Sequence, residues 1–273
     1  MEIFTLNVSQ GQFVVVCGKH EAFIVDSFVP LSSGQETIFV KAALAKILGG
    51  KNLVGLLVTG FDADHFCEPG MKVILNKYRP DWLMYPRYFK NTSKADQCFA
   101  AIDALEDSKP IRRISVLLRD NDFRFYNKNM GEEFVFEVFS PNAADMNSSN
   151  NCSIVCKVRE RSTGATYLVT GDTEADRWHE MVRAFGSKLK ADVLAAPHHG
   201  SRNGLTAAAA KLIAPHTILV SAGVESQYGH PHESAKTLFR TYALKWYATN
   251  VGDGQSLRTV ADGINVSTYK FNV

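Results

Sequence analysis

Short segments with the length and composition of strands alternate with segments of helical spacing along most of this chain. Residues 53–58 form a mostly continuous apolar run, which is typical of a strand buried on both faces. Residues 35–48 instead repeat apolar side chains at the helical period and end in two glycines. The alternation continues through residues 192–242 and predicts an α/β fold with helices outside and sheets inside.

A polar stretch rich in small residues, 140–151, is the best candidate for an internal boundary. It separates two halves, about 1–145 and 146–273, and each half mixes strands with helices. No repeat, low-complexity tract or long linker divides them. We therefore expect one domain over residues 1–273, built from two αβ halves.

Composition excludes several classes of protein. The 273 residues are 45% hydrophobic and 21% charged, which are values of a globular chain. The net charge of +2 is too small to indicate a polybasic binder of nucleic acid or membrane. No apolar run approaches the ~20 residues that a spanning helix needs, and the first residues lack the pattern of a signal peptide. Scattered cysteines argue against a disulfide framework, so we expect a cytoplasmic protein without a membrane segment.

Acidic and imidazole side chains directly follow three of the apolar strands. Such side chains can converge when the strand ends lie on one sheet edge, and binding residues concentrate on these loops. Carboxylates and imidazoles together form a donor set for a divalent metal ion. In chain order, the three signatures are Asp62 with Asp64 and His65, then Asp172, then His198 with His199.

Taken alone, each signature has a plainer explanation. Asp62 and Asp64 fit a solvated turn, and Asp172 fits a cap for the helix expected near residue 175. Paired histidines after Pro197 are rarer as plain structure. The joint occurrence of all three signatures favours a metal site.

Together with further motifs, these signatures resemble the metallo-β-lactamase superfamily of metal-dependent hydrolases. The most similar branch is the hydrolase domain of ComEC-like competence proteins, and the resemblance runs from Leu6 to about Gly254. It implies a four-layer αββα sandwich, with two β-sheets face to face, helices outside and a metal site along one edge. The motifs are VSQGQ at 8–12, IVD at 24–26, NNCS at 150–153, LVTGD at 168–172, HHGS at 198–201 and YGHP at 228–231.

One departure from the superfamily lies in the metal-binding loop. The superfamily has His-x-His-x-Asp-His there, and the ComEC-like branch often has His-x-Asp-x-Asp-His. In this chain Gly60 occupies the first position, and a glycine has no side chain to bind metal. The resemblance then implies a first metal position that lacks a ligand and keeps only a loose hold on an ion through Asp62. The second position is implied to be complete, with Asp64, His65, a bridging Asp172 and His198 as ligands.

A divalent cofactor, Zn or Mn, follows from this ligand set. Oxygen-rich donors favour Mn or Mg, whereas the histidine-rich version of the site suits Zn. Three states remain open: a single ion in the second position, a pair that forms only with substrate, or a site that no longer binds metal.

Polar groups near these ligands indicate the substrate. Imidazoles and hydroxyls around a metal suit a phosphate oxyanion better than a neutral β-lactam. We assign substrate binding to His199, Ser201 and Tyr228. Catalysis is assigned to Asp64, which would orient the attacking water, and to His230, which would stabilise developing charge or protonate the leaving group. A tight turn before a helix is the alternative explanation of residues 228–231.

Three functions remain as hypotheses. The first is a metal-dependent hydrolase of a phosphodiester or other phosphorylated substrate, either a small molecule or a nucleic acid, and the resemblance leans toward a nuclease. The second is a catalytically impaired binding or regulatory module on the same fold, which Gly60 supports. The third is hydrolysis of a C–N or thioester bond by the same chemistry. Any partner protein is left open.

Overall fold

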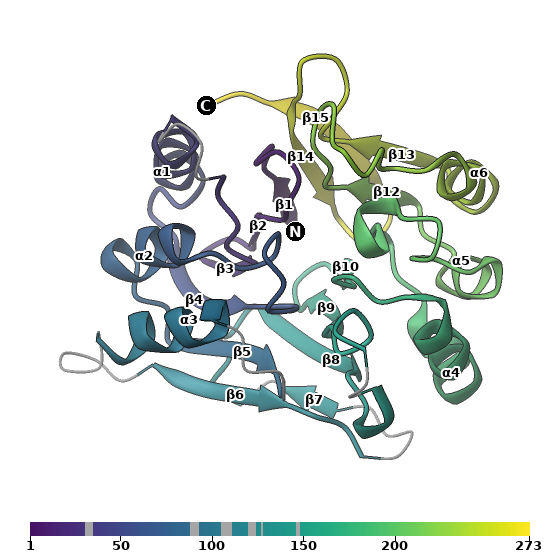
Figure 1. Cartoon of the computed structure of the whole chain (residues 1–273), viewed down its shortest axis with the longest axis horizontal. Helices are drawn as coiled ribbons and strands as arrows, with labels where there is room; N and C mark the ends of the chain where they lie inside the picture. The colour runs from purple at the N-terminus through teal and green to yellow at the C-terminus, as the bar shows by residue number, and fades with distance from the viewer. Residues whose placement is uncertain (31–34, 88–92, 105–110, 120–123, 127, 146–147) are drawn as a thin grey trace.

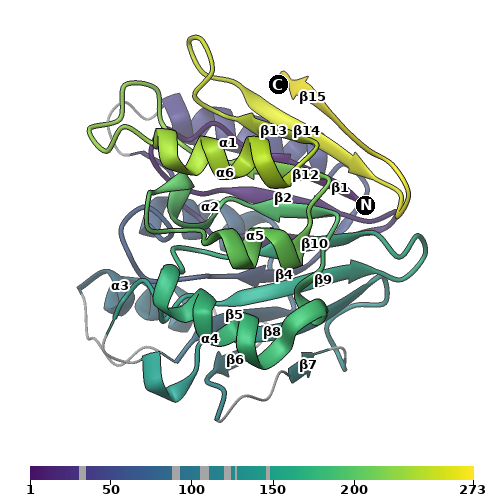
Figure 2. The same cartoon turned by 90° about the vertical axis from the view of Figure 1, so that its right-hand side faces the viewer.

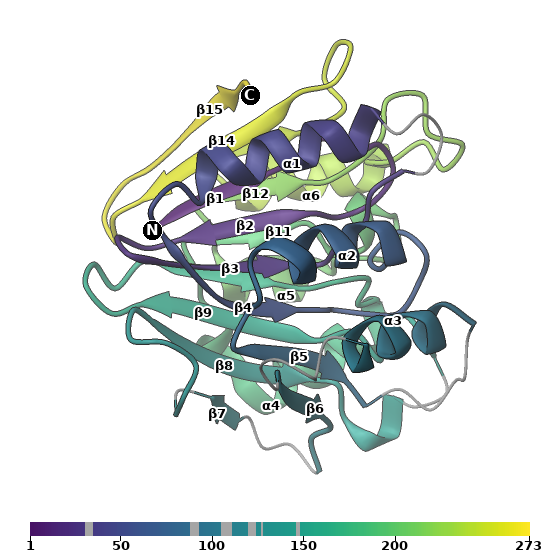
Figure 3. The same ribbon diagram turned by 90° about the vertical axis from the view of Figure 1, so that its left-hand side faces the viewer.

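Two β-sheets lie face to face between two layers of helices in the computed structural model (Figure 1). The structure describes residues 1–30, 35–87, 93–104, 111–119, 124–126, 128–145 and 148–273. The helices of the N-terminal half cover one sheet (Figure 3), and those of the C-terminal half cover the other (Figure 2). This arrangement confirms the αββα sandwich that the resemblance implies.

The first sheet combines the start and the end of the chain. Its strands are β1 (Glu2–Thr5), β2 (Val14–Cys17), β3 (Glu21–Val25), β4 (Asn52–Leu57), β5 (Trp82–Pro86), β6 (Arg112–Val116), β14 (Ser256–Ala261) and β15 (Val266–Phe271). In the described residues their order is β15-β14-β1-β2-β3-β4-β5-β6. Strands β3 to β6 run parallel to one another, whereas the rest of the sheet is antiparallel.

The second sheet is also mixed. Its strands are β7 (Arg124–Tyr126), β8 (Phe134–Ser140), β9 (Val155–Glu160), β10 (Thr166–Val169), β11 (Val193–Ala195), β12 (Thr217–Val220) and β13 (Lys245–Ala248). Over the described part of the chain their order is β13-β12-β11-β10-β9-β8-β7, with β10 to β13 parallel. The sheets do not follow the two halves of the sequence, because β7 and β8 belong to the second sheet and β14 and β15 to the first.

Each pair of neighbouring layers encloses a hydrophobic core. The helices are α1 (Gln35–Ile47), α2 (Glu68–Lys77) and α3 (Ser93–Asp103) over the first sheet, and α4 (Ala175–Phe185), α5 (Ala207–Ile213) and α6 (Glu233–Tyr242) over the second. Strand β4 buries Leu53 and Leu56 against α1 and α2, and Val54 and Leu57 against the second sheet. This burial on both faces is what its continuous apolar sequence predicts. Trp178 of α4 packs into the third core, outside the second sheet.

Parallel strands bring the polar signatures to one place. Strands β3 and β4 end at the same edge of the first sheet, and β10, β11 and β12 end together in the second. The loops after these strands carry the acids and histidines singled out in the sequence. No helix among the described residues is long and apolar enough to cross a membrane.

Candidate metal centre

The loop after β4 presents Asp64 and His65. Its turn is closed by backbone hydrogen bonds from the N–H groups of His65 and Phe66 to the carbonyl of Asp62, both at 3.1 Å. The carbonyl of Asp64 accepts a bond from the Gln12 N–H at 2.8 Å, which ties this loop to the turn between β1 and β2. These backbone hydrogen bonds hold the loop in place without any bound ligand.

A buried carboxylate fixes the orientation of the His65 ring. Nδ1 of His65 lies 2.8 Å from Oδ2 of Asp26, which is fully buried at the end of β3. The backbone N–H and the hydroxyl of Thr59 also donate to Asp26, at 2.6 and 2.7 Å. Since a carboxylate only accepts, Nδ1 carries the proton and Nε2 of the neutral ring is left as a lone pair. Orientation by such a carboxylate is typical of metal-binding histidines.

Asp172 is delivered by the sharp turn after β10. Gly171 has a φ of +52°, and a Cβ there would come within 2.9 Å of both Ser153 and Thr59, so the turn requires glycine. The N–H of Asp172 donates to Oγ of Ser153 at 3.0 Å. Its carboxylate oxygen Oδ1 lies 2.8 Å from Nε2 of His65.

His199 comes from a strained turn after β11. His198 and His199 both have positive φ, 48° and 53°. Consecutive non-glycine residues in this region are costly and tend to occur at functional sites. Nδ1 of His199 donates to the carbonyl of Ser221 at 2.7 Å, so Nε2 of this ring is also left as a lone pair.

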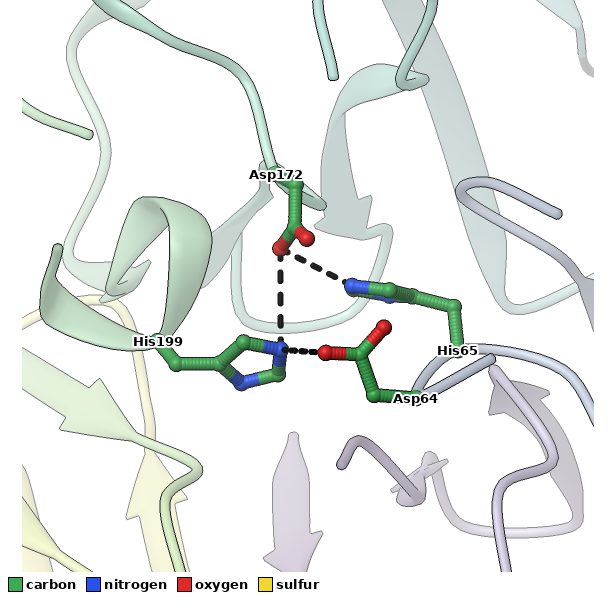
Figure 4. Close-up of side chains that lie close together, drawn as sticks. All are labelled: Asp64, His65, Asp172 and His199. Atoms are coloured by element: carbon green, nitrogen blue, oxygen red, sulfur yellow. Dashed lines mark ion pairs between the residues drawn. The ribbon is translucent and has the colours of Figure 1, made fainter. Parts of the chain in front are cut away.

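Asp64, His65, Asp172 and His199 converge on one point between the two sheets (Figure 4). One ligand atom of each lies within 4.8 Å of those of the other three. Nε2 of His199 is 3.4 Å from Oδ2 of Asp64 and 3.6 Å from Oδ1 of Asp172. Nε2 of His65, Nε2 of His199 and Oδ1 of Asp172 are buried, face one another at 2.8 and 3.6 Å, and make no well-aligned hydrogen bond. Buried polar atoms of this kind need a partner, and a shared cation satisfies all three.

The electrostatics of the four side chains favour positive charge at this point. Burial opposes the charged form of Asp172, but His65 and His199 lower the pKa of its carboxyl well below the usual value. Burial likewise opposes the imidazolium of His65, yet the carboxylates of Asp172 and Asp26 raise its pKa well above normal. With both histidines neutral, Asp64 and Asp172 leave two negative charges, which one divalent ion neutralises. The residues present therefore fit a single divalent ion bound by two oxygens and two nitrogens.

The structure places His199, rather than His198, in this group. Nε2 of His198 lies 4.0 Å from Oδ2 of Asp172, and its Nδ1 lies 3.2 Å from Oε1 of Glu174. The group of converging atoms also lacks one from Asp62, whose carbonyl closes the turn. Of the predicted ligands, Asp64, His65 and Asp172 are thus together. His198 lies at the rim, and His199 occupies the position expected of His198.

His230 and Tyr228 lie beside the group. The His230 ring is 6.2 Å from that of His199 and nearly parallel to it, and 5.8 Å from that of His198. Burial, followed by the charges of His199, His232 and His198, lowers the pKa of His230 to about 4. Tyr228 is 53% exposed, and the centre of its ring lies 5.8 Å from the centre of the His230 ring. His230 is therefore a neutral imidazole at the rim of the group.

Ser201 makes local contacts within its own loop. Its Oγ accepts from the Asn203 N–H at 3.4 Å, and its backbone N–H donates to the His198 carbonyl at 2.7 Å. Its assignment to substrate binding stays a prediction. Sequence reasoning gave no role to Asp26 or Ser221, although each is the residue directly after a strand, β3 and β12.

Two curated proteins are similar in sequence to this chain. ComE operon protein 3 of Bacillus subtilis (strain 168) is 29% identical over 266 residues, covering 91% of this chain and 32% of that protein. Competence protein ComA of Neisseria gonorrhoeae is 27% identical over 139 residues, covering 50% of this chain and 20% of that protein. The chain thus spans about a third or less of the length of these relatives. No protein-family model matches the sequence.

Solved structures share the architecture at low sequence identity. Igni18, described as a novel metallo hydrolase from Ignicoccus hospitalis KIN4/I, matches with a TM-score of 0.56 and 11% identity over 100% of both chains. A variant of CmlA beta-hydroxylase matches with a TM-score of 0.51 and 10% identity, over 99% of this chain and 54% of that one. Because proteins with differently named reactions share the fold, the reaction has to be argued from the site. The chain has the metallo-β-lactamase fold and resembles ComEC-like competence proteins over most of its length.

Proposed function

We propose that this protein is a metal-dependent hydrolase that acts on a phosphodiester or another phosphorylated substrate. The observation that carries the proposal is the convergence of Asp64, His65, Asp172 and His199, whose buried nitrogen and oxygen atoms face one point that a divalent ion would fill. Zn and Mn both suit two carboxylates and two imidazoles. A divalent ion bound there would polarise the scissile group and lower the pKa of a bound water toward ~7.

The chain's own residues would divide the remaining work. Asp64 is 28% exposed, so it is open to solvent as well as to the group and can accept a hydrogen bond from the attacking water. Asp26 and the Ser221 carbonyl hold His65 and His199 in the tautomers that leave both Nε2 atoms free. His230 would donate a hydrogen bond to the oxygen on which charge develops.

The rim of the group favours an anionic substrate. His198 and His230 lie beside it, and the rings of His230 and His232 are 4.8 Å apart. A neutral cluster, formed by one divalent ion with two carboxylates, leaves these donors free to bind phosphate oxygens. The resemblance to ComEC-like proteins favours a nucleic acid among the phosphodiesters, which makes a nuclease the first activity to assay.

Hydrolysis by metal-loaded protein tests the function. We expect Zn- or Mn-loaded protein to cleave bis(p-nitrophenyl) phosphate, single-stranded DNA or RNA, and to be inactive after chelation. A panel of carboxylic esters, thioesters and amides separates this function from hydrolysis of other bonds. Turnover of one of those compounds without any turnover of phosphodiesters would contradict the proposal.

His230→Asn tests the role of the rim donor. Loss of one donor to a developing negative charge typically lowers kcat by about 10²–10³-fold, and we expect a fall of this size. Metal content and melting temperature should stay unchanged, because the four converging residues are intact. His179→Asn, at an exposed position of α4, is the matched control. Full activity of His230→Asn would remove His230 from the site.

A catalytically impaired binding or regulatory module is the second candidate, and Gly60 favours it. A Cβ at Gly60 would meet only Ser153 Oγ, at the ordinary contact distance of 3.8 Å, so the backbone there accepts a Cβ without a clash. We expect Gly60→His to increase the binding of a second ion, measured as metal per chain by native mass spectrometry. Unchanged stoichiometry would show that Gly60 is not the altered ligand position. A second ion without faster hydrolysis would favour the binding module.

A further inference from the structure

The turn at residues 9–12, between β1 and β2, touches three parts of the metal centre. The N–H of Gln12 donates to the carbonyl of Asp64, as described above. The hydroxyl of Ser221, whose carbonyl holds His199, donates to the carbonyl of Gly11 at 2.8 Å. The side chain of Gln10 contacts His230. The contacts with Ser221 and His230 join residues more than 200 positions apart, so the turn links the beginning of the chain to its C-terminal third.

Glycines allow this close approach. A Cβ at Gly223 would lie 2.7 Å from the backbone nitrogen of Gln10, closer than real Cβ contacts. A Cβ at Gly11 would lie 2.0 Å from the ring of Phe28. The segment after β12 therefore packs directly on the turn and leaves the Gln10 side chain between that segment and His230.

Two contacts define the orientation of the Gln10 amide. Oε1 accepts a hydrogen bond from the N–H of Gly223 at 3.2 Å. Nε2 lies 3.4 Å from Nδ1 of His230. The opposite orientation would place the amide NH₂ against the N–H of Gly223, so that two donors face each other. The backbone N–H, which can only donate, thus settles which end of the amide faces the histidine.

The amide orientation in turn sets the tautomer of His230. An amide NH₂ only donates, so Nδ1 of His230 is the acceptor and carries no proton. A neutral ring then carries its proton on Nε2. Within the described part of the chain, no group is seen to accept a hydrogen bond from this Nε2–H. The Nε2–H group of His230 is thus available to donate a hydrogen bond to a ligand.

We propose that Gln10 is a positioning residue that holds His230 in the Nε2–H tautomer, so that the group His230 recognises is a hydrogen-bond acceptor such as a phosphate oxygen. The identity of the acceptor rests on the proposed function, whereas the role of Gln10 does not. The same fold positions two other histidines by their Nδ1 atoms, but there the partner accepts and Nε2 is left as a lone pair. Gln10 instead donates to Nδ1, which leaves the proton on Nε2. His230 is therefore a hydrogen-bond donor, whereas His65 and His199 are suited to bind metal.

The tautomer can be measured without any substrate. We would record long-range ¹H–¹⁵N spectra of histidine-labelled, zinc-loaded protein at pH 8.5, with His230→Asn to assign the signal. The wild-type ring should carry its proton on Nε2 only. In Gln10→Glu the new carboxylate can only accept, so Nδ1 should become protonated. Gln227→Glu adds a carboxylate at an exposed position of the loop that carries His230. It should leave the tautomer of His230 as in the wild type.

Two results would overturn the positioning role: a wild-type His230 with its proton on Nδ1, or a ring unchanged in Gln10→Glu. Inorganic phosphate tests the acceptor separately. It should shift the Nε2–H signal of the wild type, and no shift at saturating phosphate would contradict phosphate recognition. A correct tautomer together with no phosphodiester hydrolysis would count against the proposed function and leave the role of Gln10 standing.

Discussion

Asp172→Asn is expected to lose the metal and, with it, hydrolysis. Asp172 contributes a charge and approaches two of the other three converging residues, His65 at 2.8 Å and His199 at 3.6 Å. Loss of a partner that merely orients a ligand costs about 10–100-fold in metal affinity, so loss of this carboxylate should cost more than about 10²-fold. Isothermal titration with Zn measures the change. Added metal should raise the melting temperature of the wild type and leave that of Asp172→Asn unchanged.

The fold itself should survive this substitution. Asparagine has the shape of aspartate, and the backbone bond from residue 172 to Ser153 remains. Asp253→Asn, at an exposed loop position, controls for the loss of one negative charge. If Asp172→Asn binds Zn as tightly as the wild type and hydrolyses at the same rate, the four residues do not form the metal centre.

A matched pair of variants should distinguish a histidine that binds metal from a histidine that lies beside the metal centre. His199→Asn should lose the metal, whereas His198→Asn should keep one ion per chain and lose affinity for substrate only. Asparagine suits both positions because it tolerates positive φ, and at residue 199 its amide can keep the bond to the Ser221 carbonyl while removing Nε2. Metal per chain, measured by elemental analysis after gel filtration, distinguishes the two. The opposite pattern, with metal lost in His198→Asn and kept in His199→Asn, would contradict the geometry.

Regular elements were predictable because their signals are local. The helix expected at residues 35–48 is α1, Gln35–Ile47, and the strand expected at 53–58 is β4, Asn52–Leu57. Both follow from the period or continuity of apolar side chains, which reflects the faces that each element buries. The terminal hairpin around Gly263 pairs β14 with β15, and its turn is equally local. That it extends the first sheet beside β1 depends on a pairing across the whole chain, which no local pattern specifies.

Part of the candidate site can also be predicted from the sequence. Asp64, His65 and Asp172 are identified in the sequence because they lie in the loops that follow apolar strands, and the face-to-face packing of the two sheets brings these loops together. The sequence does not indicate which of His198 and His199 joins the group. Two successive residues with positive φ turn neighbouring side chains in directions that spacing does not indicate. The Gln10–His230 contact spans 220 positions and depends on the fit between Gly223 and the turn, so only the structure reveals it.

The position of the ion tests the central claim most directly. Crystals of protein loaded with Zn or Mn, measured at the absorption edge of the metal, give an anomalous difference map that locates the ion. We expect one strong peak bound by Asp64, His65, Asp172 and His199, at about 2.0–2.2 Å from each ligand atom if the metal is Zn. A peak held by His198 and Glu174, or a map without a peak near Asp172 in crystals that contain the metal, would contradict the account.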